Sequence, residues 1–318
     1  MLTKLCLSRM MNYLLVAQVY VDDIVFGATI DARAIEFSEE MKKEFEMSMV
    51  AELTFFLGLQ VKQRKEGIFI SQEKYARNIV KKFGLDSKKH AFTPMSSSTK
   101  LNVDSSRVEV SPTLYRSIIG SLLYLTASRP DIAFNVGVCA RYLAAPKESH
   151  LTAVKRIIRY VNGTLDYGLW YSKDSNACLA GYLDVDWVGN VNDRKSTSGG
   201  CFYLGNNLVS WMSKKQNSMS LSTAEAEYIA VGSCYTQLLW MKKLLHDYRI
   251  PQYTMCVFCD NTSAIYLSKN LVQHSKSKHI EIQYHFIWDL VEDKVVCLEF
   301  IHMDNQKADI FTQPLDGP

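Results

Sequence analysis

Four acidic side chains in the second half of the chain stand at strand ends or helix starts, where folding could gather carboxylates: Asp184, Glu227, Asp260 and Asp309. A carboxylate inside an apolar strand is costly unless it binds a metal or a cationic partner. Ligation by several carboxylate oxygens suits Mg²⁺ or Mn²⁺ rather than zinc. Two such ions about 4 Å apart can activate a water and stabilise the leaving oxygen of a phosphodiester. These residues therefore favour hydrolytic phosphodiester cleavage.

Spacing separates some of these acids from their neighbours. Ser222 and Glu225 form a capping box, S-x-x-E, which gives Glu225 a structural role at a helix start. Glu227 lies two residues later, roughly 200° around the helix, and is the better candidate for a site. Asp186 shares a strand face with Asp184, so the strand alone does not choose between them.

The other acids also have ordinary structural interpretations. Asp260 follows an apolar run, where α/β sheets place their sites, and a helix N-cap is the alternative interpretation. Asp309 could simply complement the dipole of the last helix. His302 is left unassigned. Cys256 and Cys259 form a C-x-x-C without a second pair at zinc spacing, which is typical of plain strand residues.

The elements that must position the acids follow from hydrophobic periodicity. The second half predicts three strands at about 177–188, 199–205 and 207–213, then a long helix at 223–248 and a strand at 254–260. A short helix, a helix near 279–292, a strand at 296–302 and a short helix from Gln306 are predicted to follow. This order predicts a mixed α/β sheet of one domain's size. The sequence contains neither a G-x-x-x-x-G-K-[ST] phosphate loop nor a G-x-S-x-G nucleophile elbow.

The first half predicts a different arrangement. Residues 16–26 form a β-branched and aromatic hairpin with Asp22 and Asp23 at its turn. Helical spacing from Leu114 to Tyr160 is broken at prolines, and Asn162–Gly163–Thr164 is the best domain boundary.

Composition and charge bound the class of protein. The 318 residues are 47% hydrophobic and 22% charged, which excludes a disordered, collagen-like or disulfide-stapled small protein. The net charge of +3 hides an asymmetry: residues 1–169 carry 23 basic and 17 acidic side chains, whereas residues 170–318 carry 13 and 16. The first half could therefore grip a polyanion, while the second half concentrates carboxylates.

Cysteine usage and hydropathy bear on the compartment. Eight scattered cysteines follow no signal peptide, so we expect an intracellular protein, in cytoplasm or nucleus, without a recognised targeting signal. The apolar stretch 13–21 is shorter than the ~20 residues of a membrane helix, and Gln18 interrupts it. We therefore expect no membrane partner.

Five motifs resemble the carboxyl-terminal part of a copia-type (Pseudoviridae) retrotransposon Pol polyprotein, of the kind common in plant genomes. They are Tyr20-Val-Asp-Asp23, Glu52-Leu-Thr-Phe-Phe-Leu-Gly-Leu59, Ile119-Gly-Ser-Leu-Leu-Tyr-Leu-Thr-Ala-Ser-Arg-Pro-Asp131, Asp193-Arg-Lys-Ser-Thr-Ser-Gly199 and Lys307-Ala-Asp-Ile-Phe-Thr312. The resemblance implies a truncated reverse-transcriptase palm over 1–95, a helical thumb/connection region over 96–165 and a ribonuclease H-like α/β domain, βββαβαβα, over 166–318.

The resemblance also implies a function for the four acids. Asp184, Glu227, Asp260 and Asp309 match the ribonuclease H carboxylates, which bind Mg²⁺ or Mn²⁺, expected as two ions, and cleave the RNA strand of RNA/DNA hybrids. Expected partners are that hybrid and other Pol-derived chains. The alternative is a non-catalytic transposon relic that binds nucleic acid or has no activity. The family's S-D-A-D-W and T-K-P-L read L-D-V-D-W and T-Q-P-L here, and neither change removes a ligand.

The polymerase part looks incomplete. Asp22 and Asp23 resemble the polymerase motif that binds catalytic metals, but residues 1–21 contain no acid that could be the third ligand. Residues 1–12 lack a recognised family pattern, so we expect an arbitrary start in a fragmented element. We expect no DNA polymerase activity from this chain alone, unless another chain supplies the missing palm. The two aspartates then either hold a metal weakly or cap a turn.

Two basic sets could contact nucleic acid. Residues 62–89 hold nine basic side chains against three acids, including Lys62, Arg64 and Lys65. Phosphate contacts by these side chains would weaken steeply with salt. Lys276 and Lys278 flank the predicted nuclease site and could contact the hybrid backbone. A solvated helix face is the alternative interpretation of the first set.

Overall fold

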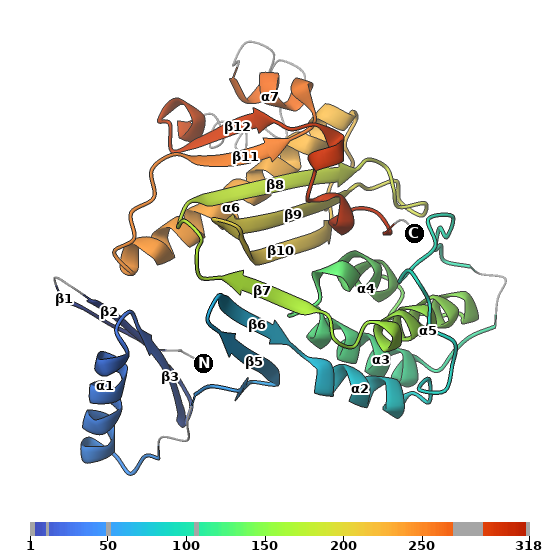
Figure 1. The fold of residues 1–318 in the computed structure, drawn as a ribbon. Coiled ribbons are helices and arrows are strands. Elements are labelled where there is room, and N and C mark those ends of the chain that lie inside the picture. Colours follow the sequence, from blue (N-terminus) through green and yellow to red (C-terminus); the bar gives the residue numbers. More distant parts are fainter. Residues whose placement is uncertain (1–3, 11–12, 49–51, 105–107, 270–288, 316–318) are drawn as a thin grey trace. The chain divides into compact units, whose positions relative to one another are not determined.

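The structure, a computed structural model, describes residues 4–10, 13–48, 52–104, 108–269 and 289–315 (Figure 1). The chain divides into two compact units, Met1–Phe56 and Leu57–Pro318. The boundaries predicted after residues 95 and 165 both fall inside the second unit. As divisions of function they stay predictions.

The first unit is an antiparallel three-stranded sheet with one helix. Its elements are β1 (Lys4–Met10), β2 (Tyr13–Tyr20), β3 (Asp23–Ala28), α1 (Asp31–Glu44) and the short β4 (Phe55–Phe56). The predicted hairpin is confirmed, since β2 and β3 pair from Leu15 opposite Ala28 to Tyr20 opposite Asp23. Helix α1 packs on β3 through Phe37, whose ring centroid lies 5.0 Å from that of Phe26.

The second unit begins with a small antiparallel sheet and a cluster of helices. These elements are β5 (Leu59–Arg64), β6 (Gly67–Ser71), α2 (Glu73–Lys82), α3 (Pro112–Leu125), the 3-10 turn η1 (Pro130–Ile132), α4 (Ala133–Ala140), α5 (Glu148–Gly163) and β7 (Gly168–Ser172). Strand β7 pairs with β6, so residues on both sides of the predicted boundary at 165 share one sheet. Helices α2 to α5 pack together around apolar side chains such as Tyr115 and Ile157.

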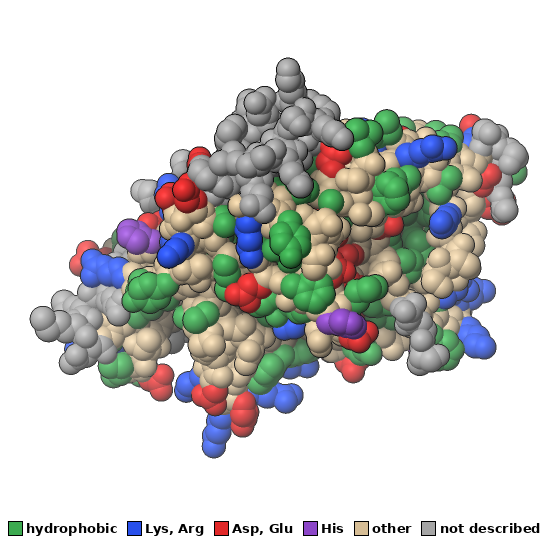
Figure 2. Space-filling view, turned by 90° about the horizontal axis from the view of Figure 1, so that it is seen from above, with side chains coloured by type: hydrophobic (Ala, Val, Ile, Leu, Met, Phe, Trp, Pro, Cys, Tyr) green, Lys and Arg blue, Asp and Glu red, His purple; other side chains and the backbone are tan. Residues whose placement is uncertain are grey.

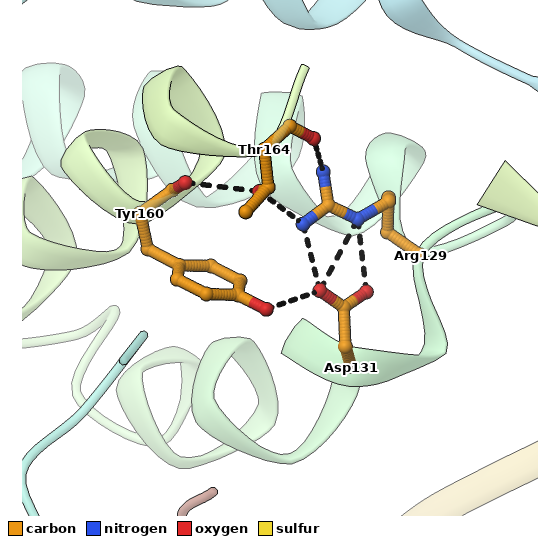
Figure 3. A network of polar contacts seen from close by, with 4 residues as sticks. All are labelled: Arg129, Asp131, Tyr160 and Thr164. Atoms are coloured by element: carbon orange, nitrogen blue, oxygen red, sulfur yellow. Dashed lines mark hydrogen bonds and ion pairs between the residues drawn. The ribbon is translucent and has the colours of Figure 1, made fainter. Parts of the chain in front are cut away.

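A buried arginine joins two segments of this helical cluster (Figure 3). Arg129 is 2% exposed, and its Nε and Nη2 atoms donate to the two Asp131 carboxylate oxygens at 2.9 and 2.7 Å. Its Nη1 and Nη2 atoms also donate to the carbonyl and hydroxyl oxygens of Thr164, at 2.8 and 2.7 Å. The Tyr160 hydroxyl donates to Asp131 at 2.9 Å. This network ties the end of α5 to the turn that precedes α4.

A five-stranded mixed sheet follows, in the strand order β10-β9-β8-β11-β12. Its elements are β8 (Leu179–Asp186), β9 (Thr197–Leu204), β10 (Asn207–Lys215), α6 (Thr223–Asp247), β11 (Met255–Cys259), α7 (Thr262–Lys269), β12 (Val296–Phe300) and the 3-10 turns η3 (Met303–Asn305) and η4 (Asp309–Phe311). Strands β8, β9 and β10 are antiparallel, while β11 runs parallel to β8 and β12. The predicted mixed α/β sheet is confirmed.

Two details of the predicted order differ. The last element is not a helix from Gln306 but the three-residue turn η4, because Asp309 and Thr312 close short backbone hydrogen bonds there. Most of the helix predicted over 279–292 lies outside the described residues.

Different elements cover the two faces of this sheet (Figure 1). Helix α6 packs against β8, β9 and β11, and buries Leu183 and Val257 on that face. The opposite face is covered by η4 and α4, with Phe311 at the centre of a smaller apolar cluster. Gly199 permits this close approach, since a methyl group there would lie 2.7 Å from Thr312 Cγ2.

Surface and length features complete the description. On the face shown in Figure 2, acidic, basic and apolar side chains are interspersed rather than gathered by type. None of the helices in the described ranges is both long enough and apolar enough to cross a membrane.

Candidate active site

Four different elements of the second unit carry the predicted carboxylates. Asp184 is half-buried on β8, Glu227 is 5% exposed on the first turns of α6, and Asp260 directly follows β11. Asp309 is the first residue of η4 and is half-buried. The folding of a strand, a helix and two connections thus brings together acids that lie up to 125 residues apart in the sequence.

Glu227 and Asp260 form the tightest part of this group. One carboxylate oxygen of each, together with the Cys259 sulfur, lie within 4.8 Å of one another. The Cys259 thiol donates toward Glu227 Oε2 at 3.9 Å. Burial, reinforced by the negative charges of Asp184 and Asp260, raises the pKa of Glu227 to about 9. Burial also raises the pKa of Asp260.

Asp184 and Asp309 are joined through Thr312. The Thr312 hydroxyl donates to Asp184 and also lies 3.0 Å from the carbonyl oxygen of Asp309. Burial raises the pKa of Asp184 despite the Thr312 hydrogen bond, and the charge of Asp260 adds to the rise. Burial, with the charges of Asp184 and Asp260, raises the pKa of Asp309 to about 6.

These shifts show that the four carboxylates repel one another electrostatically. Such a group of oxygen donors in a partly dehydrated place suits a hard divalent cation, which would relieve the repulsion. Within the described ranges, Asp184 and Asp309 belong to no three-ligand group as tight as that of Glu227, Cys259 and Asp260.

Glu225 and Asp186 are the acids that lie next to Glu227 and Asp184 in the sequence, and the structure shows the surroundings of both. Ser222 accepts a hydrogen bond from the Glu225 backbone at 3.1 Å, which is the N-cap half of the predicted capping box. The Glu225 side chain accepts one at 2.7 Å from the backbone of Leu221, the residue before the N-cap, so Glu225 has a structural role at the helix start, as predicted. Burial raises the pKa of Asp186, followed by the charge of Asp184, while Arg141 opposes the rise. Asp186 is thus subject to the positive charge of Arg141 as well as to the negative charge of Asp184, whereas Asp184 interacts with the charges of the other site carboxylates.

Sequence reasoning missed two residues of this site and left one aside. Cys259 belongs to the noted C-x-x-C, yet its proximity to Glu227 depends on how α6 packs on β11. Thr312 ends a quoted motif, but its contact with Asp184 spans 128 residues. His302 turns away toward Asp304, with 3.2 Å between its Nδ1 atom and Asp304 Oδ2.

The remaining predicted residues lie apart from this group or outside the description. Asp22 and Asp23 are exposed at the β2–β3 turn, where Val21 adopts a φ of 53°, an uncommon conformation for a β-branched residue. Lys62 and Arg64 on β5, with Lys65 in the following turn, are exposed, so the basic surface is present but its role stays a prediction. Lys276 and Lys278 lie outside the described residues.

The raised pKa of Glu227 gives a prediction about the metal-free chain. The ordinary pKa of about 4.5 applies in the unfolded state, so the folded state binds the extra proton between pH 4.5 and about 9. Folding stability therefore falls as pH rises through this window. We expect Glu227→Gln to remove much of this loss and to stabilise the chain at pH 9 by at least about 2 kcal/mol, with little gain at pH 4.

Urea unfolding in the presence of a chelator, followed by tryptophan fluorescence at several pH values, measures this effect. Glu66→Gln, at an exposed turn, is the matched control and should show no pH-dependent gain. A gain for Glu227→Gln that is the same at pH 4 and pH 9 would contradict the linkage.

Comparison with known proteins places the chain in a family. The reverse transcriptase (RNA-dependent DNA polymerase) family matches residues 5–97, so a family pattern extends into residues 1–12, contrary to expectation. The retrovirus-related Pol polyprotein from transposon RE2 of Arabidopsis thaliana is 35% identical over 97% of this chain and 21% of its own length. The corresponding polyprotein from transposon RE1 is 36% identical over 93% of this chain and 20% of its own.

A solved structure also matches part of the chain. A ribonuclease H1 isolated from compost is 16% identical, with a TM-score of 0.34, over 42% of this chain and 92% of that one.

This chain belongs to the retrovirus-related Pol polyproteins of copia-type transposons, as the resemblance implied. It spans about a fifth of the length of these relatives.

Proposed function

We propose that residues 166–318 form a ribonuclease H-like domain that hydrolyses the RNA strand of RNA/DNA hybrids. The observation that carries this proposal is the grouping of four carboxylates from β8, α6, η4 and the end of β11. Oxygens of Glu227 and Asp260 lie within 4.8 Å of each other, and Thr312 contacts both Asp184 and the backbone of Asp309. Carboxylates grouped in this way suit divalent cations and phosphodiester cleavage. Membership of the Pol family gives the site a nucleic-acid setting.

Mg²⁺ or Mn²⁺, as two ions, is the cofactor proposed for this site. When bound, the ions supply activation of a water and neutralisation of charge on the phosphate. The residues fit this cofactor because Asp184, Glu227, Asp260 and Asp309 offer hard oxygen donors whose pKa values are all raised. A cation favours the ionised form that burial and mutual repulsion disfavour.

Neighbouring side chains of this chain hold the carboxylates in position. Thr312 fixes one oxygen of Asp184 and the backbone of Asp309 together. The Cys259 thiol orients Glu227 by hydrogen bonding, and burial keeps that carboxyl protonated at neutral pH in the absence of cation. Uptake of cation therefore requires release of a proton from Glu227.

The front part has a separate proposed role. Residues 1–95 correspond to a reverse-transcriptase palm region, for which we propose no polymerase activity in this chain. Asp22 and Asp23 are its paired acids, and residues 1–21 contain no third one. The exposed Lys62, Arg64 and Lys65 would contact phosphates of bound nucleic acid.

Incubation of the full chain with an end-labelled RNA/DNA hybrid and Mg²⁺ tests this function and the choice between Asp184 and Asp186. We expect cleavage of the RNA strand by the unmodified chain, without extension of an added primer. Asp184→Asn should reduce the rate at least about a hundredfold, because an ionic ligand contributes several kcal/mol. Asp186→Asn should change it by no more than about threefold.

The two variants are matched because both make the same isosteric change on the same strand face. Loss of activity in Asp186→Asn with full activity in Asp184→Asn would reverse the assignment. An unmodified chain that leaves the hybrid intact would contradict the proposed function and favour the non-catalytic relic.

A further inference from the structure

A second cluster of metal-binding atoms lies on the parallel pair β11–β12. Cys256 and Cys297 stand directly opposite each other in the register of these strands. Glu299 lies two residues beyond Cys297 and therefore on the same face of β12. Both cysteines are half-buried free thiols and Glu299 is exposed, so the cluster is open to solvent.

This cluster is separate from the proposed active site. The side chains of Val257 and Cys259 are buried on the face of β11 that α6 covers. Cys256 alternates with them along the strand and so projects to the opposite face. The C-x-x-C of the sequence is thus divided between the two faces of the sheet, and the partner of Cys256 comes from β12.

The distances within the cluster match those of a bound metal. The sulfurs of Cys256 and Cys297 lie 3.5 and 3.6 Å from the same oxygen, Oε1 of Glu299. All three ligand atoms lie within 4.8 Å of one another. Two ligands of a tetrahedral zinc ion, a sulfur and a carboxylate oxygen, are about 3.6 Å apart when their bond lengths to the metal are ordinary.

We propose that Cys256, Cys297 and Glu299 form a binding site for a thiophilic divalent cation such as Zn²⁺, with the fourth position open to solvent. Two thiolates select zinc or cadmium over magnesium, because soft ligands prefer soft ions. The bound ion cross-links β12 to β11, the strand that leads into Asp260. The site needs no activity of the chain and is independent of the proposed function.

Proton release should accompany binding at this site. Burial raises the pKa of the Cys256 thiol and also that of Cys297, so both are protonated at neutral pH without metal. A metal binds thiolates, so each ion should displace about two protons and bind more tightly as pH rises.

Titration of the reduced full chain with Cd²⁺, followed by the ultraviolet thiolate-to-cadmium absorption band, tests the proposal. We expect one Cd²⁺ ion to bind per chain. Added Zn²⁺ should displace the cadmium and so abolish the absorption band. The double variant Cys256→Ser, Cys297→Ser should lose the band. Glu299→Gln should weaken cadmium binding at least about tenfold. Loss of a group that merely hydrogen-bonds to a metal ligand already lowers metal affinity by about tenfold, and Glu299 is a proposed ligand itself.

Two control variants separate this site from other thiols and from the active site. Cys178→Ser removes an exposed free cysteine and should leave the titration unchanged. Asp260→Asn should also keep the band, since it alters only the other cluster. The proposal is overturned if the reduced chain gives no band, or if the band survives in the double variant. A chain that is first oxidised in air and then reduced again should also bind cadmium; if it does not, the proposal is contradicted.

Discussion

Asp260→Asn is expected to reduce cleavage of the RNA strand of an RNA/DNA hybrid by on the order of a thousandfold, because a lost metal-ligand charge costs several kcal/mol in the transition state. Asp260 directly follows β11, and its charge raises the pKa values of Asp184, Glu227 and Asp309. Because such repulsion is mutual, Asp184 and Asp260 each interact with the three other carboxylates. Neutralisation of Asp260 should therefore weaken cation binding strongly.

The measurement is the initial cleavage rate of a labelled hybrid at saturating Mg²⁺. Asp174→Asn makes the same isosteric change at an exposed position of the same unit and should retain the full rate. Circular dichroism should show that both variants fold. Equal rates for the unmodified chain and Asp260→Asn would rule out cleavage by this carboxylate group, and any residual activity would then come from elsewhere.

The largest expected effect on stability comes from Arg129→Ala. Arg129 is buried against Asp131 and Thr164, and its removal leaves the Asp131 carboxylate without its cation. Breaking a buried, hydrogen-bonded ion pair on one side typically costs about 3–5 kcal/mol. Arg129→Lys should recover only part of this loss, because an ammonium cannot replace the planar guanidinium fork.

Urea unfolding followed by tryptophan fluorescence measures this change in the second unit alone. All five tryptophans, at positions 170, 187, 211, 240 and 288, belong to that unit. Arg77→Ala is the matched control, since Arg77 is 62% exposed in its ion pair with Glu73 and should contribute less than about 1 kcal/mol. Equal unfolding midpoints for Arg129→Ala and Arg77→Ala would show that the buried network contributes little.

Short-range patterns in the amino-acid sequence were enough to predict the local elements and the types of residue at the site. Hydrophobic periodicity predicted the hairpin at 16–26, the long helix and the strands of the mixed sheet, because each of these patterns is set by neighbours within a few residues. The capping box distinguished Glu225 from Glu227 for the same reason, since helical geometry fixes which side chain turns back to the helix start.

Which of these elements contact one another depends on how the whole chain packs. Strand β7 joins β6 across the predicted boundary at 165, because strand pairing depends on edges that become available after folding. Thr312 donates a hydrogen bond to Asp184, and Cys256 lies opposite Cys297 rather than beside Cys259. These contacts join distant segments, so hydrophobic periodicity does not predict them. Residue types and short spacings can be read directly from the sequence. The register between distant strands cannot, because it results from burying both faces of the sheet at once.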